Sequence, residues 1–252
     1  MRIAIKFAYD GKFFHGFARQ PDLKTVEGDL INALVKQNII KDLNESFFRI
    51  GSRTDKGVSA LGNVVAFNTN FFKKDIIKNL SDELENILIY GYAEVDSDFN
   101  PRYAKYRHYR YFLKNDGFDF EKLIDAANVF TGKHNFSNFA RVESFKDPVR
   151  TIDNIVFSEE NNIIIIDFFA QTFLWHQIRR IVSSLEKIGM GKIEKDQIIN
   201  ALNNPKEKFD FGLAPAEPLI LQDVIYDFQF EKDINLFNKL KKMNNKLLKN
   251  LF

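Results

Sequence analysis

The chain has 252 residues, of which 45% are hydrophobic and 28% charged, a balance that excludes wholesale disorder and allows one or two domains. It contains no cysteine, which excludes disulfides, thiolate zinc sites, iron–sulfur clusters and cysteine nucleophiles. Lysine and arginine total 36 against 34 acids, so the formal net charge of +2 does not by itself indicate nucleic-acid binding.

Metal and membrane signals are also missing from the sequence. No histidine lies three or four positions from another, so there is no local two-histidine metal motif; the four are His15, His108, His134 and His176. No apolar stretch approaches the ~20 residues that span a bilayer, and no signal peptide precedes the first strand-like run. We therefore expect a metal-free cytoplasmic protein.

The first 100 residues combine strand and helix signals. Alternating Ile3, Ile5 and Phe7 predict a strand over 2–9. Thr25 is a favourable N-cap, and apolar residues follow it at helical spacing. The other predicted elements of this part are strands over 46–50 and 63–69, a helix over 73–88 and a strand over 89–95. Their order is β-α-β-β-α-β.

The rest of the chain repeats that order. Its predicted elements are a strand over 106–113, a helix over 120–130, strands over 150–157 and 163–170 around a turn at 159–162, a helix over 174–189, a strand over 219–230 and a basic helix over 233–251. In the helix over 174–189 the spacing places one set of residues on a core face: Trp175, Ile178, Val182, Leu185 and Ile188.

Each copy of β-α-β-β-α-β matches the ferredoxin-like unit. We therefore predict an α+β protein with two ferredoxin-like halves, 1–103 and 104–252, that form an extended, mainly antiparallel sheet with a central active-site cleft. Two functions suit such a surface: an RNA-binding platform, or an enzyme with its site in the cleft.

A stretch from Arg102 to Lys114 is basic and aromatic and contains no acid. Its cations and histidine are Arg102, Lys105, Arg107, His108, Arg110 and Lys114, and its aromatics are Tyr103, Tyr106, Tyr109 and Tyr111. Such cations can contact the phosphates of a nucleic acid, and tyrosine rings can stack on its bases.

The segment with the sharpest chemical signal surrounds Asp55, between two predicted strands. Arg53 and Lys56 flank this single acid, and two nearby cations favour its ionised form. An ionised, positioned carboxylate can act as a nucleophile or a base. The alternative from composition alone is a tight β-hairpin with an Asx-type turn.

The string Arg53-Thr54-Asp55-Lys56-Gly57-Val58 resembles the catalytic motif of the tRNA pseudouridine synthase A family. Further segments resemble that family in the same order along the chain. They are Tyr9-Asp10-Gly11, Thr25-Val26-Glu27-Gly28, Phe99-Asn100-Pro101-Arg102, His108-Tyr109-Arg110-Tyr111, Asp147-Pro148-Val149-Arg150, Phe173 to Val182, and Leu213-Ala214-Pro215-Ala216. Together these matches span roughly residues 1 to 228.

The resemblance implies an enzyme that converts uridine to pseudouridine in the anticodon arm of tRNA, at positions 38 to 40. It implies that Asp55 is the catalytic aspartate, that Tyr109 stacks on the target base, and that Arg179 pairs with the aspartate. Arg53, Arg102 and Arg110 are then expected to hold the RNA. The reaction needs no cofactor, and the family's members are homodimers.

Several features depart from the family pattern. Ser52 stands before the motif arginine where the family has glycine, Phe17 replaces a tryptophan, and Ser183 follows Ile-Val where a glycine is common. Pro218 also replaces a usual glycine, and the Arg102 to Tyr109 spacing is one residue shorter than in many bacterial members. Two other functions stay open beside the synthase. One is a non-catalytic RNA-binding protein, and the other is an enzyme acting on small nucleosides.

Overall fold

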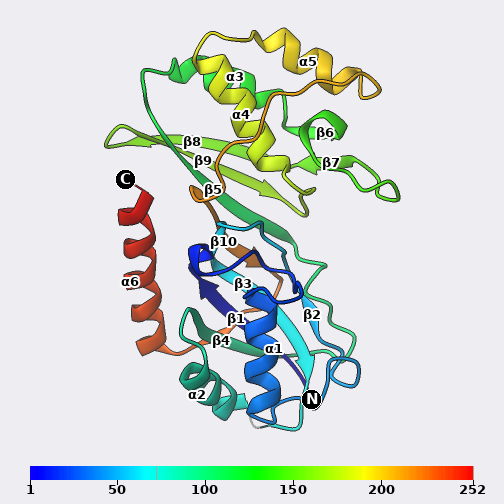
Figure 1. The fold of residues 1–252 in the computed structure, drawn as a ribbon, viewed down its shortest axis with the longest axis vertical. Coiled ribbons are helices and arrows are strands. Elements are labelled where there is room, and N and C mark those ends of the chain that lie inside the picture. Colours follow the sequence, from blue (N-terminus) through cyan, green and yellow to red (C-terminus); the bar gives the residue numbers. More distant parts are fainter. Residues whose placement is uncertain (72, 252) are drawn as a thin grey trace. The chain divides into compact units, whose positions relative to one another are not determined.

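The computed structural model describes residues 1–71 and 73–251 and divides the chain into two compact units (Figure 1). The first unit comprises Met1–Lys105 together with Ile220–Phe252, and the second comprises Tyr106–Leu219. The predicted boundary after residue 103 lies two residues from this division. Residues 220–252, which the prediction assigned to the second half, group with the first unit.

The first unit is built around β1 (Arg2–Tyr9), which pairs antiparallel with β3 (Ser59–Asn68) on one side and β4 (Ile87–Val95) on the other. The short strand β2 (Arg49–Ile50) extends the sheet antiparallel to β3. The helices of the first half are α1 (Val26–Lys36) and α2 (Lys73–Glu83). The strand order β4-β1-β3-β2 follows from these pairings.

All eight residues of β1 are buried, including Arg2 and Lys6, although alternation predicted one polar face. The structure satisfies both cations. The Arg2 guanidinium donates to the carbonyl of Phe99 at 2.7 Å, and Lys6 Nζ lies 2.5 Å from Asp223 Oδ1. Both partners lie far along the chain: Phe99 is near the end of the predicted first half, and Asp223 lies beyond it.

The C-terminal segment belongs to the first unit because its strands pair with strands of that unit. β10 (Leu219–Ile225) pairs parallel with β3 at Ser59 and Ala60. β11 (Glu231–Lys232) pairs antiparallel with β4, and α6 (Ile234–Leu251) packs against the same strand. The upright red helix in Figure 1 is α6.

The second unit has a sheet in the order β5-β9-β8, with antiparallel pairing throughout. These strands are β5 (Tyr106–Lys114), β8 (Asn154–Glu160) and β9 (Ile163–Ala170). A separate two-stranded sheet pairs β6 (Gly132–Asn135) with β7 (Val149–Ile152). The helices are α3 (Phe120–Asn128), α4 (Gln177–Gly189) and α5 (Lys195–Asn203), with 3₁₀ turns η1 (Gly11–Phe13) in the first unit and η2 (Ser137–Phe139) in the second.

The predicted α+β class with mainly antiparallel strands is confirmed. The strand over 163–170 and the N-cap at Thr25 are also confirmed, since the Thr25 side chain accepts from Gly28 N at 3.2 Å. The turn between β8 and β9 is made by Asn161 and Asn162, both with positive φ.

Some predicted strands are longer than the observed ones, and one of them is two separate strands in the structure. The strand over 46–50 is reduced to β2, because Phe47 has a left-handed backbone at the end of a turn. The strand over 150–157 is divided between β7 and β8, and Asp153 N between them bonds the carbonyl of Phe169. The strand over 219–230 ends at Ile225.

The helix predicted over 174–189 begins at Gln177 instead. His176 before it has φ 65°, and Leu174 N donates to Gln177 Oε1 at 2.8 Å, so the preceding backbone turns away from the helix. The placement of Trp175 on the core face was therefore wrong, and its side chain is 45% exposed. β6 and α5 were not predicted at all.

Candidate functional site

Asp55 lies on the loop between β2 and β3 in the first unit and is partly buried. Backbone and side-chain bonds hold this loop at its centre. Phe17 N donates to Thr54 O at 3.1 Å, and the Tyr9 hydroxyl lies 2.8 Å from Thr54 Oγ1. Val58 N donates to Asp55 O at 3.2 Å and closes the turn. The loop is therefore fixed on both sides of the carboxylate.

Two glycines allow the N-terminal segment to approach this loop closely. A Cβ on Gly11 would lie 2.4 Å from Val58 O, and Gly11 N donates to Ser59 Oγ at 3.0 Å. Gly16 has φ +105°, and a Cβ there would lie 3.3 Å from Lys56 N. The family-like segment Tyr9-Asp10-Gly11 thus supports the loop that follows β2.

Ser52, which stands where the family has glycine, is accommodated without strain. Its backbone does not have a positive φ, so a Cβ is tolerated. The buried Asn63 side chain binds both polar groups of the Ser52 backbone: Nδ2 donates to Ser52 O at 2.8 Å, and Oδ1 accepts from Ser52 N at 3.2 Å. Phe17, the second departure, is fully buried beside Phe7 and Tyr9.

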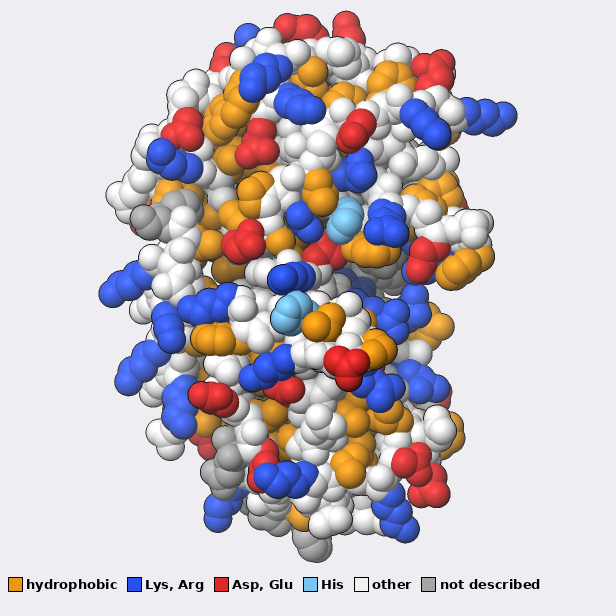
Figure 2. Space-filling model, viewed as in Figure 1, with side chains coloured by type: hydrophobic (Ala, Val, Ile, Leu, Met, Phe, Trp, Pro, Cys, Tyr) orange, Lys and Arg blue, Asp and Glu red, His pale blue; other side chains and the backbone are white. Residues whose placement is uncertain are grey.

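The other predicted residues of the first unit, Arg53 and Arg102, are exposed. Arg53 is two residues from Asp55 on the same loop. Arg102 follows β4, and its backbone N donates to Asn100 Oδ1 at 3.1 Å. Figure 2 shows cationic and acidic side chains interspersed on the face it draws, consistent with the near-zero net charge.

In the second unit, Tyr109 and Tyr111 share one face of β5 and are both buried, but they are held differently. The Tyr111 hydroxyl donates to Pro215 O at 3.2 Å. Burial raises the pKa of Tyr111, and the nearby Glu186 carboxylate adds to the effect, so this phenol stays a neutral donor. Tyr109 is 6% exposed and meets Phe173 edge-on at 5.5 Å between ring centroids.

The opposite face of β5 carries an ion-pair cluster that the sequence did not predict. Asp167, opposite Arg110 in the β5–β9 register, accepts two bonds from its guanidinium: Nε to Oδ1 at 2.8 Å and Nη2 to Oδ2 at 2.9 Å. His108 Nε2 lies 2.5 Å from the same Oδ1. The acid that pairs with the basic stretch therefore comes from β9, which is adjacent to β5 in the sheet but distant along the chain.

The pKa of Asp167 reflects opposing effects. Burial acts to raise the pKa of this carboxyl, but the hydrogen bonds from His108 and Arg110 and the charge of Arg110 outweigh burial, so the pKa lies below its usual value. Asp167 is thus held as a carboxylate between two strands, and Arg110 is oriented by a bidentate contact.

Arg179, in the first turn of α4, is anchored by a loop of the same unit. Its Nε donates to Ala214 O at 2.8 Å, and Ala214 N donates back to Arg179 O at 3.1 Å. One turn later, Ser183 Oγ donates to Phe211 O at 2.7 Å. This serine, the third departure from the family pattern, therefore ties α4 to the loop that holds Arg179.

The structure thus places the predicted site residues in two groups. Asp55, Arg53 and Arg102 belong to the first unit, whereas Tyr109, Arg110 and Arg179 belong to the second. Reasoning from sequence missed Asn63, which binds the Ser52 backbone beside Arg53, and Asp167, which orients Arg110. Asn63 gave no local signal, and Asp167 was an acid in an apolar strand.

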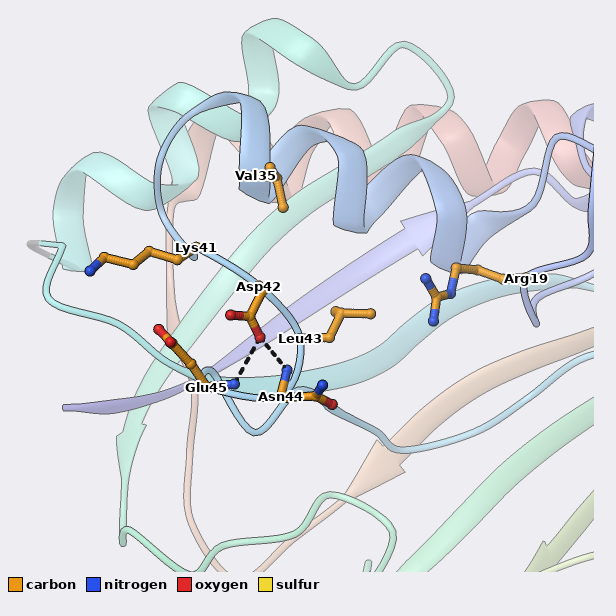
Figure 3. Close-up of a pocket in the computed structure, with 7 residues that line it drawn as sticks. All are labelled: Arg19, Val35, Lys41, Asp42, Leu43, Asn44 and Glu45. Atoms are coloured by element: carbon orange, nitrogen blue, oxygen red, sulfur yellow. Dashed lines mark hydrogen bonds between the residues drawn. The ribbon is translucent and has the colours of Figure 1, made fainter.

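A surface hollow of the first unit involves other residues (Figure 3). It is lined by Arg19, Val35, Lys41, Asp42, Leu43, Asn44 and Glu45. The Asp42 carboxylate accepts from Asn44 N at 2.7 Å and Glu45 N at 2.9 Å, so it closes a turn. No predicted site residue lines this hollow.

Among the side chains that the structure describes, no three histidine, aspartate or glutamate residues are arranged to ligate a metal ion. Over residues 1–71 and 73–251, no helix has both the length and the apolar character needed to cross a bilayer.

Comparisons with known proteins agree on one family. A family model described as tRNA pseudouridine synthase matches residues 126–227. The tRNA pseudouridine synthase A of Thermococcus sibiricus is 46% identical over 246 residues, which cover 96% of this chain and 91% of that protein. The protein of the same name from Pyrococcus abyssi is 42% identical, covering 96% and 91%.

Among solved structures, a Cbf5-Nop10-Gar1 complex aligns with a TM-score of 0.35 at 14% identity, covering 72% of this chain and 45% of that one. This likeness is too distant to carry an argument. The relatives named tRNA pseudouridine synthase A are close over nearly their whole length, and they are the informative comparison.

Proposed function

The chain belongs to the tRNA pseudouridine synthase A family and isomerises uridine in tRNA, and we propose that its targets lie in the anticodon arm, at positions 38 to 40, with Asp55 as the catalytic residue. The observation that carries this proposal is the Asp55 loop. Phe17 N bonds the loop backbone at Thr54, Tyr9 bonds the Thr54 side chain, and Gly11 N bonds the side chain of Ser59. Tyr9 and Gly11 lie in the family-like segment Tyr9-Asp10-Gly11. A carboxylate held in this way is preorganised for attack or proton abstraction.

In the proposed reaction the bond between ribose C1′ and uracil N1 breaks, the base turns, and C1′ bonds to C5. The proton lost from C5 goes to solvent, and N1 gains a proton, so no other reactant is consumed. Reaching a uridine within the anticodon arm requires that the base leave the stack. Asp55 would act on the extruded nucleoside.

The remaining predicted residues have supporting roles in this proposal. Arg179 would pair with Asp55 and keep it ionised, which the anchoring of Arg179 by Ala214 supports. Tyr109 would stack on the base. Tyr111 lies on the same face of β5 and is the alternative for this role, but its hydroxyl already donates to Pro215 O. Arg53, Arg102 and Arg110 would contact the RNA, with Arg110 oriented by Asp167.

The proposal extends to architecture and assembly. We propose two ferredoxin-like halves, which the β4-β1-β3-β2 order of the first unit supports. We also propose a homodimer that binds tRNA across both subunits, and sedimentation of the purified protein alone and with tRNA would test it. A monomer in both conditions would refute the dimer without affecting the chemistry.

The decisive experiment uses unmodified tRNA labelled with tritium at uracil C5. Pseudouridine formation releases this tritium to water, and mapping the product locates the modified positions. We expect release by the parent protein without added metal or nucleotide. Asp55→Asn, which removes a charge but little volume, should release none while binding tRNA normally. Turnover by Asp55→Asn would refute the catalytic role, and tRNA binding without turnover by the parent would favour a non-catalytic RNA-binding protein.

A further inference from the structure

Trp175 is the chain's single tryptophan and is 45% exposed, although Leu174 and Ile178 near it in the chain are buried. Leu174 is 7% exposed and Ile178 only 4%. A large indole ring left in water beside a filled core suggests a surface that contacts another molecule, because tryptophan is enriched at binding interfaces. Nothing proposed above for the reaction uses this side chain.

Arg141 is stacked on the exposed ring. Its guanidinium carbon lies 4.2 Å from the centre of the Trp175 ring. The two backbones also pair, because Arg141 N donates to Trp175 O at 2.8 Å in an isolated β-bridge. The pair therefore joins the segment after η2 to the segment before α4, and its geometry does not depend on two freely moving side chains.

The backbone next to Trp175 is held in an unusual conformation. His176 has φ 65°, which is uncommon for a residue with a side chain, and its ring centre lies 5.0 Å from that of Trp175. Such conformations persist where the surroundings enforce them, often at functional sites. Here Gln177 enforces it through bonds to Leu174 in both directions. Arg179 follows within the first turn of α4.

We propose that the Arg141–Trp175 pair is a stacking site for an unpaired nucleobase of the RNA substrate, separate from the target uridine. This inference rests on the proposed function, because it assigns a second contact to the same tRNA. A base offers a flat π-face that both an indole and a guanidinium can stack on, and its strand carries the negative charge that Arg141 complements. The site lies four residues before Arg179 along the chain, so a base held there is tied to the segment that carries the arginine.

Because Trp175 is the only tryptophan, the protein's tryptophan fluorescence reports on this site alone. The first probe is an unmodified tRNA transcript, titrated into the parent protein. We expect saturable quenching as a base stacks on the indole. Transcripts with a single abasic position in the anticodon loop should identify the stacked nucleotide, because removing that one base should restore most of the fluorescence.

Matched variants separate stacking from charge. Trp175→Ala should weaken tRNA binding about tenfold, which is within the range of one base–aromatic stack, and Trp175→Phe should recover most of the loss. Arg141→Lys keeps the charge but loses the planar group, so it should weaken binding severalfold. Lys146→Ala is the control for charge on the same exposed segment. Lys146 already pairs with Glu143, so its loss should change affinity less than twofold.

Two results would overturn the stacking site. One is tryptophan fluorescence unchanged at saturating tRNA, and the other is Trp175→Ala binding within twofold of the parent. A response to added peptides but not to tRNA would assign the surface to a protein partner instead. Tritium release by the parent protein is measured in parallel. If release occurs while these results are negative, only the stacking site fails; if the parent releases no tritium, the proposed function fails first.

Discussion

The loop that carries Asp55 and the strand that carries Tyr109 and Arg110, β5, are positioned with the help of different kinds of interaction. The loop is held mainly through backbone groups, with Gly11 and Gly16 allowing a close approach of the N-terminal segment. β5 is held by its backbone pairing with β9 and, in addition, by side chains: the Tyr111 hydroxyl on one face and the Asp167 ion pairs on the other. The first arrangement tolerates few changes of shape, whereas the second tolerates few changes of charge.

After the complete loss expected for Asp55→Asn, the largest effect is expected from Arg179→Ala, which removes the proposed charge partner of Asp55. Turnover should fall by about 100- to 1,000-fold, the usual cost of losing a preorganised electrostatic contact, while tRNA affinity changes little. The matched control is Arg180→Ala, its neighbour on α4, which pairs with Asp210 at 3.4 Å. Tritium release under single-turnover conditions measures both. Equal rates in the two variants would show that Arg179 has no special role.

A shape change in the Asp55 loop should have the next largest effect. The Cβ of Gly11→Ala would lie 2.4 Å from Val58 O, so the backbone must shift. We expect a 10- to 100-fold loss of turnover, because misplacement of about 1 Å is costly to catalysis, and a loss of about 1–3 kcal/mol in the free energy of unfolding.

The control for this prediction is Gly117→Ala in the second unit. Gly117 has φ +90° and nothing within 4 Å of an added Cβ, so the substitution introduces backbone strain without a clash. It should cost about 1 kcal/mol of stability and leave turnover unchanged. Normal turnover by Gly11→Ala would mean that the Asp55 loop adapts to a change of shape. The proposed difference between this loop and β5 would then be wrong.

Features that depend on residues close together in the sequence were mostly predicted, whereas features that depend on distant residues were not. The N-cap at Thr25 and the strand over 163–170 were predicted because their signals lie within a few residues. The Asp55 loop was found through its motif, although Asn63, which fixes Ser52, gave no local signal. The helix α5 could have been found, because Glu194 and Gln197 form a capping box.

Two features could not be predicted from local patterns. Helical spacing continued through Trp175. The left-handed backbone of His176 and the bridge between Trp175 and Arg141 take Trp175 out of the helix. The basic stretch contained no acid, and the register that sets Asp167 against Arg110 joins residues 57 positions apart. A strand register depends on the whole sheet, so reasoning from short segments left Arg110 without its partner.

The smallest effect on turnover, and the sharpest test of the charge-held region, is expected from Asp167→Asn. The free energy of unfolding should fall by about 1–3 kcal/mol at neutral pH, because Arg110 and His108 lose a charged acceptor, while turnover stays within a few-fold of the parent. Asp210→Asn is the control: this carboxylate is 82% exposed, so its loss should cost less than about 1 kcal/mol.

The pH dependence of this stability difference follows from the lowered pKa of Asp167. A carboxyl whose folded-state pKa is depressed stabilises the fold fully above its unfolded pKa of about 3.9, and this contribution is lost as the pH falls through the folded value. Urea unfolding of the parent and Asp167→Asn should therefore show a constant gap near neutral pH that closes below about pH 4. A gap that persists in acid would mean that the charge of Asp167 adds nothing to the backbone pairing of β5 with β9, and the two regions would then be held alike.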